Sequence, residues 1–331
     1  MNPRILVTDY AWPDLTIETR ILERIGGQIV LPEERSDAGL TDLLRDVSAI
    51  LTCWSPVTAP MLEAAARCRV VARYGVGIDN IDVAKATELG ILVTNVPDYC
   101  VDEVAEHAMA LILSSVRKIC VFNAQTDAGR WDNRAGGEIH RLRGQTLGLV
   151  GYGRIARAVA ARALAFGMRV RAYDPYLAAV SGSVGDDVEF ERTIHELLAA
   201  ADVVSLHVPL TSQTAGLIST PEFSVMKANA ILVNTARGGL VDLPALRRAL
   251  DSQSIAGAAL DVLPTEPPDP ASIRERASNL LITPHASFYS VESVQDLQRR
   301  TAESTVQCLM GRIPDNVVNP DVLASPSLRV R

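Results

Sequence analysis

Short apolar runs alternate with longer amphipathic stretches along the first third of the chain. The apolar runs lie at residues 5–7, 49–51, 70–72 and 91–93. Runs of this length, separated by helical patterns, are typical of strands in a mostly parallel sheet whose faces are covered by helices. The pattern therefore predicts an α/β fold.

A second alternating series begins after residue 145. Its apolar runs lie at residues 146–150, 169–173, 203–206, 230–233, 255–260 and 280–283. Six strand candidates match the strand count of a complete dinucleotide-binding sheet. The second series therefore predicts a Rossmann-type doubly wound parallel sheet, and the first predicts a separate α/β domain. The chain is expected to cross between them at 95–97 and again after Pro284.

Three further segments complete the expected organisation. A helix at 101–116 has apolar residues on more than one stripe, which predicts packing between domains or subunits. A closing helix is expected at about 291–310. The last residues, 324–331, are typical of a loosely held tail.

Composition narrows the class of protein. The chain has 331 residues, of which 48% are hydrophobic, enough for two domains with ordinary cores. Its formal net charge of -7 argues against a general binder of nucleic acid or of anionic membranes. The first residues lack the features of a signal peptide, and no apolar run approaches the roughly 20 residues that cross a bilayer. Five scattered cysteines predict free thiols in a reducing cytoplasm.

A glycine-rich turn opens the second series. The sequence Gly151-Tyr-Gly-Arg-Ile-Ala156 lies between a strand pattern and a helix pattern. Gly151 would permit the tight turn, Gly153 would let the backbone approach a pyrophosphate, and Ala156 would allow close helix packing. Ordinary turns also carry this motif, so its context decides. Here it is followed about 20 residues later by Asp174, where a ribose diol is expected.

Asp174 also predicts which nicotinamide cofactor binds. Pro175 and Tyr176 follow it, and no arginine stands just beyond it to neutralise a 2′-phosphate. A carboxylate there would repel that phosphate, so we expect NAD(H) rather than NADP(H). The alternative is a solvated aspartate at a strand end.

Three ionisable residues follow late strands of the second series: Arg237, Glu266 and His285. Taken singly, an arginine at a strand end is usually a phosphate or ion-pair anchor, a glutamate beside prolines is a solvated loop residue, and a histidine after a strand is a structural residue. At one edge of one parallel sheet, they would form a set. Reduction of a 2-oxo acid needs a cation for the substrate, a proton donor, and a carboxylate that keeps the donor charged. Arginine, histidine and glutamate suit these tasks in turn.

The chain resembles the D-isomer-specific 2-hydroxyacid dehydrogenase family from Ile5 to about Pro320. The likeness lies in residues 74–82, 151–156 with Asp174, 234–239, and Glu266 with 284–285. It implies two similar α/β domains. A flavodoxin-like substrate domain would comprise residues 1–97 and 286–331, and an NAD-binding domain residues 98–285.

The resemblance also assigns roles to residues. Arg237, Glu266 and His285 match the family's catalytic residues, and the backbone amides of Val76 and Gly77 would help to hold the substrate carboxylate. The implied cofactor contacts are Gly151, Gly153, Arg154, Ile155, Asp174, His207, Pro209, Thr214, Thr235 and Asp261. The D stereochemistry rests on the resemblance alone.

Within the family, residues 284–290 and 95–103 resemble the branch that contains the C-terminal-binding-protein corepressors. Arg73 matches an arginine which that branch places near the substrate. Phe288 stands where the corepressors carry tryptophan, and Cys100, an expected cofactor contact, where they carry serine. Phe288 is expected either to wall the substrate pocket or to pack at a hinge.

Other candidate residues carry weaker signals. His107, His140 and His195 lack ligand spacing, so no metal is expected. Ser287 and Ser290 lack the strand–elbow context of a serine hydrolase. The three tryptophans, Trp12, Trp54 and Trp131, are interpreted as packing residues.

The sequence thus predicts an NAD-dependent oxidoreductase that transfers a hydride between nicotinamide and C2 of a small 2-oxo or 2-hydroxy acid. Glyoxylate, hydroxypyruvate, phenylpyruvate and more specialised acids remain open, and a cytoplasmic homodimer is expected. One alternative is an NAD-sensing scaffold like the corepressors. Another is oxidation of phosphite or formate on the same scaffold, although the formate enzymes pair histidine with glutamine.

Overall fold

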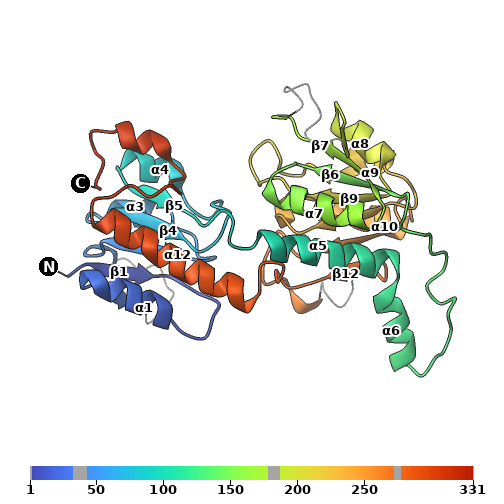
Figure 1. The fold of residues 1–331 in the computed structure, drawn as a ribbon, viewed down its shortest axis with the longest axis horizontal. Coiled ribbons are helices and arrows are strands. Elements are labelled where there is room, and N and C mark those ends of the chain that lie inside the picture. The colour runs from blue at the N-terminus through green and yellow to red at the C-terminus, as the bar shows by residue number, and fades with distance from the viewer. Residues whose placement is uncertain (1, 33–42, 178–186, 272–276, 331) are drawn as a thin grey trace. The chain divides into compact units, whose positions relative to one another are not determined.

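The protein is described by a computed structural model that covers residues 2–32, 43–177, 187–271 and 277–330. It divides into two compact units, each with its own parallel sheet (Figure 1). The first unit comprises Met1–Tyr99 with Ser290–Arg331, and the second comprises Cys100–Tyr289. Both division points lie a few residues beyond the domain boundaries expected from the sequence.

The first unit contains a five-stranded sheet in the order β2-β1-β3-β4-β5. The strands are β1 (Arg4–Val7), β2 (Gln28–Val30), β3 (Ala49–Thr52), β4 (Val70–Arg73) and β5 (Leu92–Thr94). All four neighbouring pairs are parallel, and this order is that of the flavodoxin-like fold. The strands are short apolar runs because helices cover both faces of the sheet.

Helices of the first unit come from both ends of the chain. They are α1 (Thr16–Leu22), the 3₁₀ turn η1 (Glu23–Ile25), α3 (Ala59–Ala64), α4 (Val83–Glu88), α12 (Val291–Leu309) and the 3₁₀ turn η3 (Pro320–Ala324). α12 packs against α1 and lies over β3, β4 and β5. A core on the other face joins strand residues such as Ile50 and Val71 to Leu62 of α3.

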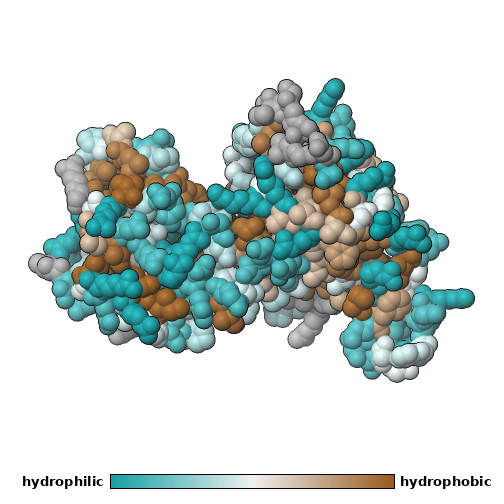
Figure 2. All heavy atoms as spheres, in the orientation of Figure 1, coloured by the Kyte–Doolittle hydropathy of each residue, from teal (hydrophilic) through white to brown (hydrophobic). Residues whose placement is uncertain are grey.

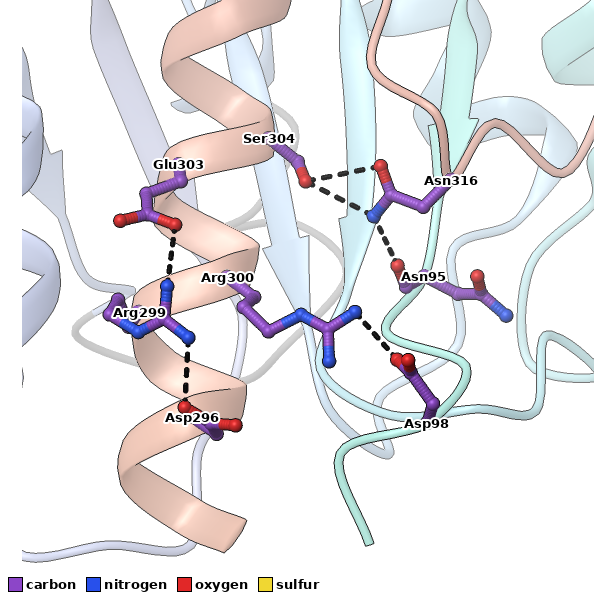
Figure 3. Close-up of polar contacts among 8 residues, drawn as sticks. All are labelled: Asn95, Asp98, Asp296, Arg299, Arg300, Glu303, Ser304 and Asn316. Atoms are coloured by element: carbon purple, nitrogen blue, oxygen red, sulfur yellow. Dashed lines mark hydrogen bonds and ion pairs between the residues drawn. The ribbon is translucent and has the colours of Figure 1, made fainter. Parts of the chain in front are cut away.

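The chain leaves β5 through a segment that is fastened to the C-terminal part of the unit (Figure 3). Asn316 donates from its side-chain amide to the carbonyl of Asn95 and contacts Ser304 of α12. Arg300 of α12 forms an ion pair with Asp98 at 2.5 Å. The end of this strand is therefore held by residues about 200 positions away along the chain.

The C-terminal residues are not the loose tail expected from the sequence. The Arg329 guanidinium donates to the carbonyls of Ala65 and Cys68 at 2.9 and 3.0 Å, and Val330 is only 4% exposed. The backbone of Ser327 lies so close to Gly90 that a Cβ there would stand 1.9 Å from its carbonyl oxygen. Polar and proline residues suggested a free end, but the guanidinium and this close approach fix it.

The second unit contains a seven-stranded parallel sheet in the order β12-β11-β10-β9-β6-β7-β8. Its strands are β6 (Thr146–Val150), β7 (Arg169–Tyr173), β8 (Val188–Phe190), β9 (Val203–Leu206), β10 (Ile231–Asn234), β11 (Gly257–Leu260) and β12 (Leu280–Ile282). Read from β8, this is the Rossmann order with a seventh strand added, and its switch point lies between β6 and β9. The sequence missed β8, since only Val188 of its three residues is buried.

Helices cover both faces of this sheet. They are α5 (Val101–Val116), α6 (Ile119–Asp127), α7 (Arg154–Ala165), α8 (Ile194–Ala200), α9 (Thr220–Val225), the 3₁₀ turn η2 (Gly238–Leu240) and α10 (Leu243–Asp251). α5 and α7 share one core cluster, and α8, α9 and α10 share another. α5 packs on α7, β10 and β11, so its broad apolar surface is covered within its own unit rather than requiring a second domain or subunit.

Only one of the three tryptophans is a packing residue. Trp12 is 7% exposed, whereas Trp54 is 43% exposed and Trp131 is 94% exposed. Hydrophilic side chains, in teal, and apolar side chains, in brown, are both exposed on each unit (Figure 2). Among the described residues, no helix combines the length and the apolar character needed to cross a membrane.

Candidate active site

The three predicted catalytic residues follow three neighbouring strands of the second unit. Arg237 comes after β10, Glu266 lies in the loop after β11, and His285 comes just after β12. β10 pairs with β11 and β11 pairs with β12, both in parallel. Because parallel strands end at the same edge of a sheet, the topology brings all three segments to one edge.

Glu266 and His285 are in direct contact. The His285 Nδ1 lies 2.6 Å from Glu266 Oε2, and the Leu263 amide donates to Glu266 Oε1 at 2.7 Å. Burial raises the pKa of the Glu266 carboxyl, but the His285 hydrogen bond and charge, with the Leu263 amide, outweigh it, and the pKa is lowered overall. The carboxylate is therefore held ionised beside the imidazole and orients its ring.

His285 sits in a tight turn. Its φ of 51° lies in the left-handed region, which a non-glycine residue adopts only when its surroundings hold it there. The Phe288 ring meets the imidazole edge-on, with centroids 6.1 Å apart and planes at 80°. Phe288 therefore lies beside the predicted proton donor, and its two expected roles, a pocket wall and a hinge residue, both stay predictions.

Arg237 is carried by a loop that touches the Glu266 loop. Asn234 at the end of β10 accepts from the Ala236 amide at 3.0 Å and donates to the Arg237 carbonyl at 2.8 Å, which folds the loop back. The next residue, Gly238, approaches the neighbouring backbone so closely that a Cβ would lie 1.9 Å from the Leu263 carbonyl carbon. The arginine loop and the loop of the acid–base pair are thus packed backbone to backbone.

The glycine-rich turn has the geometry of a dinucleotide site. Gly151 has a φ of 87°, and a Cβ there would lie 2.9 Å from the His207 carbonyl oxygen, so only glycine fits. Gly153 is the N-cap of α7, and a Cβ there would meet nothing within 4 Å. The positive end of a 12-residue helix therefore faces open space, as a pyrophosphate site requires.

Asp174 is fixed beside this turn. One carboxylate oxygen accepts from the Tyr152 amide and the other from the Tyr176 amide, both at 3.0 Å. Arg154 and Ile155 open α7, and Ala156 is fully buried, as its packing role requires.

Other expected cofactor contacts lie at the ends of β9 and β10 or at the start of α5. Burial lowers the pKa of His207 to about 4, so this imidazole is neutral, and it contacts the Ser205 hydroxyl at 2.9 Å. Thr214 donates its hydroxyl to the Pro209 carbonyl at 2.6 Å. The Thr235 hydroxyl is buried and has no hydrogen-bond partner among the described residues. Cys100 is the buried N-cap of α5.

These features fit a nicotinamide dinucleotide. The open helix terminus suits a pyrophosphate, and the Asp174 carboxylate suits a ribose diol. The Thr235 hydroxyl, which pairs with no described residue, suits a polar group of the ligand.

The expected substrate-binding residues lie at the end of β4 and just after it in the first unit: Arg73 is the last residue of the strand, and Val76 and Gly77 follow it. Arg73 is buried and donates to Asn80 Oδ1 at 3.2 Å and to the Tyr74 carbonyl. The amides of Val76 and Gly77 donate no hydrogen bond within the part of the chain that the structure describes. They therefore remain able to bind an anionic group.

The sequence did not predict that two polar side chains, Asp9 and Asn80, bind the backbone of the loop that follows β3. The Asp9 carboxylate accepts from the amides of Cys53, Trp54 and Ser55 at 2.7–3.1 Å. Asn80 donates to the carbonyls of Cys53 and Ser55 from the other side at 3.3 and 2.9 Å. An aspartate directly after the apolar run of β1 was the available signal.

His107 was considered in the sequence only as a metal ligand, and its polar partners were not predicted. It lies on α5 between the buried Val104 and Leu111, and its Nε2 is 3.0 Å from the Thr283 hydroxyl and 3.4 Å from the Asp261 carboxylate. A histidine on the apolar stripe of a helix was the signal, but its partners Asp261 and Thr283 follow β11 and β12, far along the chain.

The sequence matches the family described as D-isomer specific 2-hydroxyacid dehydrogenase, NAD binding domain, over residues 109–287. It is 36% identical to a glyoxylate reductase of Korarchaeum cryptofilum over 98% of both chains. The chain belongs to the D-isomer specific 2-hydroxyacid dehydrogenase family. The resemblance seen in the sequence is therefore confirmed at the level of the family.

Other members of the family differ in length and cofactor. The chain is 39% identical to a D-3-phosphoglycerate dehydrogenase of Methanocaldococcus jannaschii over 96% of its own length but spans only 59% of that protein. A D-lactate dehydrogenase from Aquifex aeolicus, solved with NAD and lactic acid, matches 95% of this chain and 99% of its own with a TM-score of 0.85 and 29% identity.

A glyoxylate/hydroxypyruvate reductase from Sinorhizobium meliloti, solved with NADP and malonate, matches 100% of this chain and 99% of its own with the same TM-score and identity. These structures confirm the predicted pairing of a Rossmann domain with an α/β substrate domain. They also indicate a nicotinamide cofactor for this fold.

Proposed function

We propose that this protein catalyses reversible hydride transfer between nicotinamide and C2 of a small 2-oxo or 2-hydroxy acid. The observation that carries the proposal is the 2.6 Å contact between His285 and Glu266 at the sheet edge that also presents the Gly151–Asp174 dinucleotide site. The nicotinamide, when bound, supplies or accepts the hydride. The family name supports a D-configured hydroxy acid.

In reduction, His285 donates a proton to the carbonyl oxygen of the substrate. The ionised Glu266 accepts from the Nδ1 of this imidazole and fixes its orientation. Arg237 stabilises the negative charge that develops on the same oxygen and binds the substrate carboxylate. Arg73 and the amides of Val76 and Gly77 complete the set of substrate contacts.

The cofactor contacts follow from the same geometry. The turn at Gly151 and Gly153, continued by Arg154 and Ile155, holds the pyrophosphate at the start of α7. The contacts proposed for the rest of the dinucleotide are Asp174, Cys100, His207, Pro209, Thr214, Thr235 and Asp261.

Asp174 supports NAD(H) over NADP(H), because its fixed carboxylate would repel a 2′-phosphate. The test compares reduction rates with NADH and NADPH at equal concentration for the wild type and for Asp174→Ala. We expect faster turnover with NADH and a smaller preference in the variant. Faster turnover of the wild type with NADPH would reject this assignment.

The substrate is proposed only as a class. Glyoxylate, hydroxypyruvate, phenylpyruvate and D-3-phosphoglycerate are the first compounds to test. The contact between Phe288 and His285 favours an aromatic wall beside C2, but it does not fix the size of the substrate. NADH oxidation is measured with each 2-oxo acid, and NAD reduction with the hydroxy acid. Turnover of at least one compound is expected, and no turnover across a broad panel of these acids would overturn the proposal.

A homodimer is proposed from the exposed surface of the second unit. α6 buries none of its nine residues and extends away from the sheet of its own unit (Figure 1). Ile119 at its start is 54% exposed, and Trp131 shortly after it is 94% exposed. Large apolar side chains at this exposure favour a partner surface.

The intact set of Arg237, Glu266 and His285 favours an enzyme over an NAD-sensing scaffold, and no described feature favours phosphite or formate oxidation. The relatives described above are named as dehydrogenases and reductases, so the corepressor-like branch stays a prediction. A cytoplasmic location stays a prediction as well.

A further inference from the structure

The Asp261 carboxylate holds the turn that carries His285 from both sides. Its Oδ1 accepts from the Thr283 hydroxyl at 2.6 Å and from the Ala286 amide at 2.9 Å, and its Oδ2 accepts from the Ser287 amide at 2.9 Å. The His285 amide donates to the Asp261 backbone carbonyl at 2.7 Å. These contacts offset the cost of the left-handed backbone at His285.

The protons available on Asp261 and Thr283 fix the direction of the hydrogen bond between His107 and Thr283. Burial raises the pKa of Asp261, but hydrogen bonds from Thr283, Ser287 and Ala286 outweigh it, and the pKa is lowered overall. The ionised carboxylate can only accept, so the single hydroxyl proton of Thr283 points to Asp261. The oxygen of Thr283 can then only accept from His107, whose Nε2 is 3.0 Å away. His107 must therefore carry a proton on Nε2.

We propose that His107 is a positioning residue for the reaction, which acts through Thr283 and Asp261 to hold the turn of His285. The inference rests on the proposed function, because it assumes that His285 is the proton donor. α5 packs on β10 and β11, which gives His107 a rigid base beside the end of β11. Without the Nε2 donor, the Thr283 hydroxyl is free to rotate away from Asp261, and the turn loses one of its fixed contacts.

The expected effect is a loss of rate rather than of cofactor affinity. Small displacements of a catalytic group reduce the rate strongly. Of the proposed dinucleotide contacts, Gly151 and Asp174 do not involve His107, and Asp261, which lies 3.4 Å from His107, keeps its hydrogen bonds from the Ala286 and Ser287 amides. Methionine and glutamine are of similar length and both suit a helix, but only glutamine can donate to Thr283. The His107→Met and His107→Gln variants therefore differ mainly in the hydrogen bond under test.

The experiment measures kcat, the KM for NADH and the melting temperature with the best substrate of the wild type. His107→Met should lower kcat roughly 3- to 30-fold with the KM for NADH within about twofold, while His107→Gln should recover most of kcat. His195→Met is the control, since His195 is 53% exposed on α8 and pairs with Glu222, away from His285; it should leave both constants unchanged. Equal kcat for the wild type and His107→Met, or an equal loss in the Gln variant, would overturn the proposal.

A second variant keeps the test decisive if His107→Met does not fold. Thr283→Val removes the hydroxyl that links His107 to Asp261 and should lower kcat by a similar factor. The double variant should lose no more than the larger single loss, because both changes break one chain of contacts. Multiplied losses would overturn the proposal. If the wild type reduces no 2-oxo acid, the proposed function fails first; if it does and the variants match it, only the positioning role fails.

Discussion

At the scale of single residues, the proposed role of His285 as proton donor depends on the ionised Glu266 beside it. Because the pKa of Glu266 is lowered, the carboxylate is charged throughout the neutral range and lies 2.6 Å from His285 Nδ1. Glutamine at this position keeps the shape but loses the charge. We expect Glu266→Gln to reduce the 2-oxo acid about 10-fold more slowly at the alkaline end of the pH–rate profile, with a smaller loss at pH 6. Profiles of identical shape for the two proteins would contradict the pairing.

Asp9 provides a test of pH-dependent stability. Burial raises the pKa of Asp9, but the amides of Trp54 and Cys53, the Thr8 hydroxyl and the amide of Ser55 outweigh it, so the folded pKa lies below the unfolded value. Its stabilising effect is therefore complete above the unfolded pKa of about 3.9 and is lost as pH falls through the folded pKa.

Asp9→Asn should lower the free energy of unfolding by about 1–3 kcal/mol at pH 7, because an amide cannot accept at both positions. Denaturant unfolding of both proteins at several pH values measures the difference, which should shrink below pH 4. A constant difference across that range would mean that the Asp9 charge is not the cause.

The sequence predicts Arg237, Glu266 and His285 as one site because each follows a strand of one predicted sheet, and the structure confirms that these strands are parallel neighbours. It did not identify Asp9, Asn80 or His107. Their partners are backbone groups and hydroxyls far along the chain, which no local spacing reveals.

At the scale of elements, the two glycines of the turn between β6 and α7 are expected to have different roles, one in stability and one in cofactor binding. Gly151 has a left-handed φ and a crowded Cβ position, whereas Gly153 has neither. Gly151→Ala should lower the free energy of unfolding by about 1–3 kcal/mol. Gly153→Val should leave unfolding nearly unchanged but raise the Kd for NADH at least 10-fold, since its side chain would occupy the pyrophosphate position. Fluorescence titration and thermal unfolding measure the two effects, and unchanged NADH affinity in Gly153→Val would place the dinucleotide elsewhere.

The predicted elements failed where burial did not follow the simple pattern. β8 was missed because an edge strand of three residues with one buried side chain shows no clear period. The C-terminal segment was misjudged because its order comes from Arg329 and from the close approach at Gly90, neither of which alters the local hydropathy.

At the scale of the whole molecule, the exposed apolar residues around α6 predict self-association. Sedimentation equilibrium should give about twice the chain mass of 35.6 kDa. Ile119→Asp combined with Trp131→Asp should shift the protein toward one chain mass while each unit stays folded, because a buried charge opposes association. The mass of a single chain for the wild type would rule out the homodimer.

The central claim is that His285, held by Glu266, donates the proton in reduction of a 2-oxo acid. The most direct test is His285→Asn in a single-turnover reaction, with enzyme in excess over NADH and the best 2-oxo acid added at saturation. NADH fluorescence titration checks binding separately. We expect normal NADH affinity and a rate of NADH oxidation that falls 10²–10⁴-fold, the range typical for loss of a general acid. A rate within a few fold of the wild type would show that the proton comes from another group.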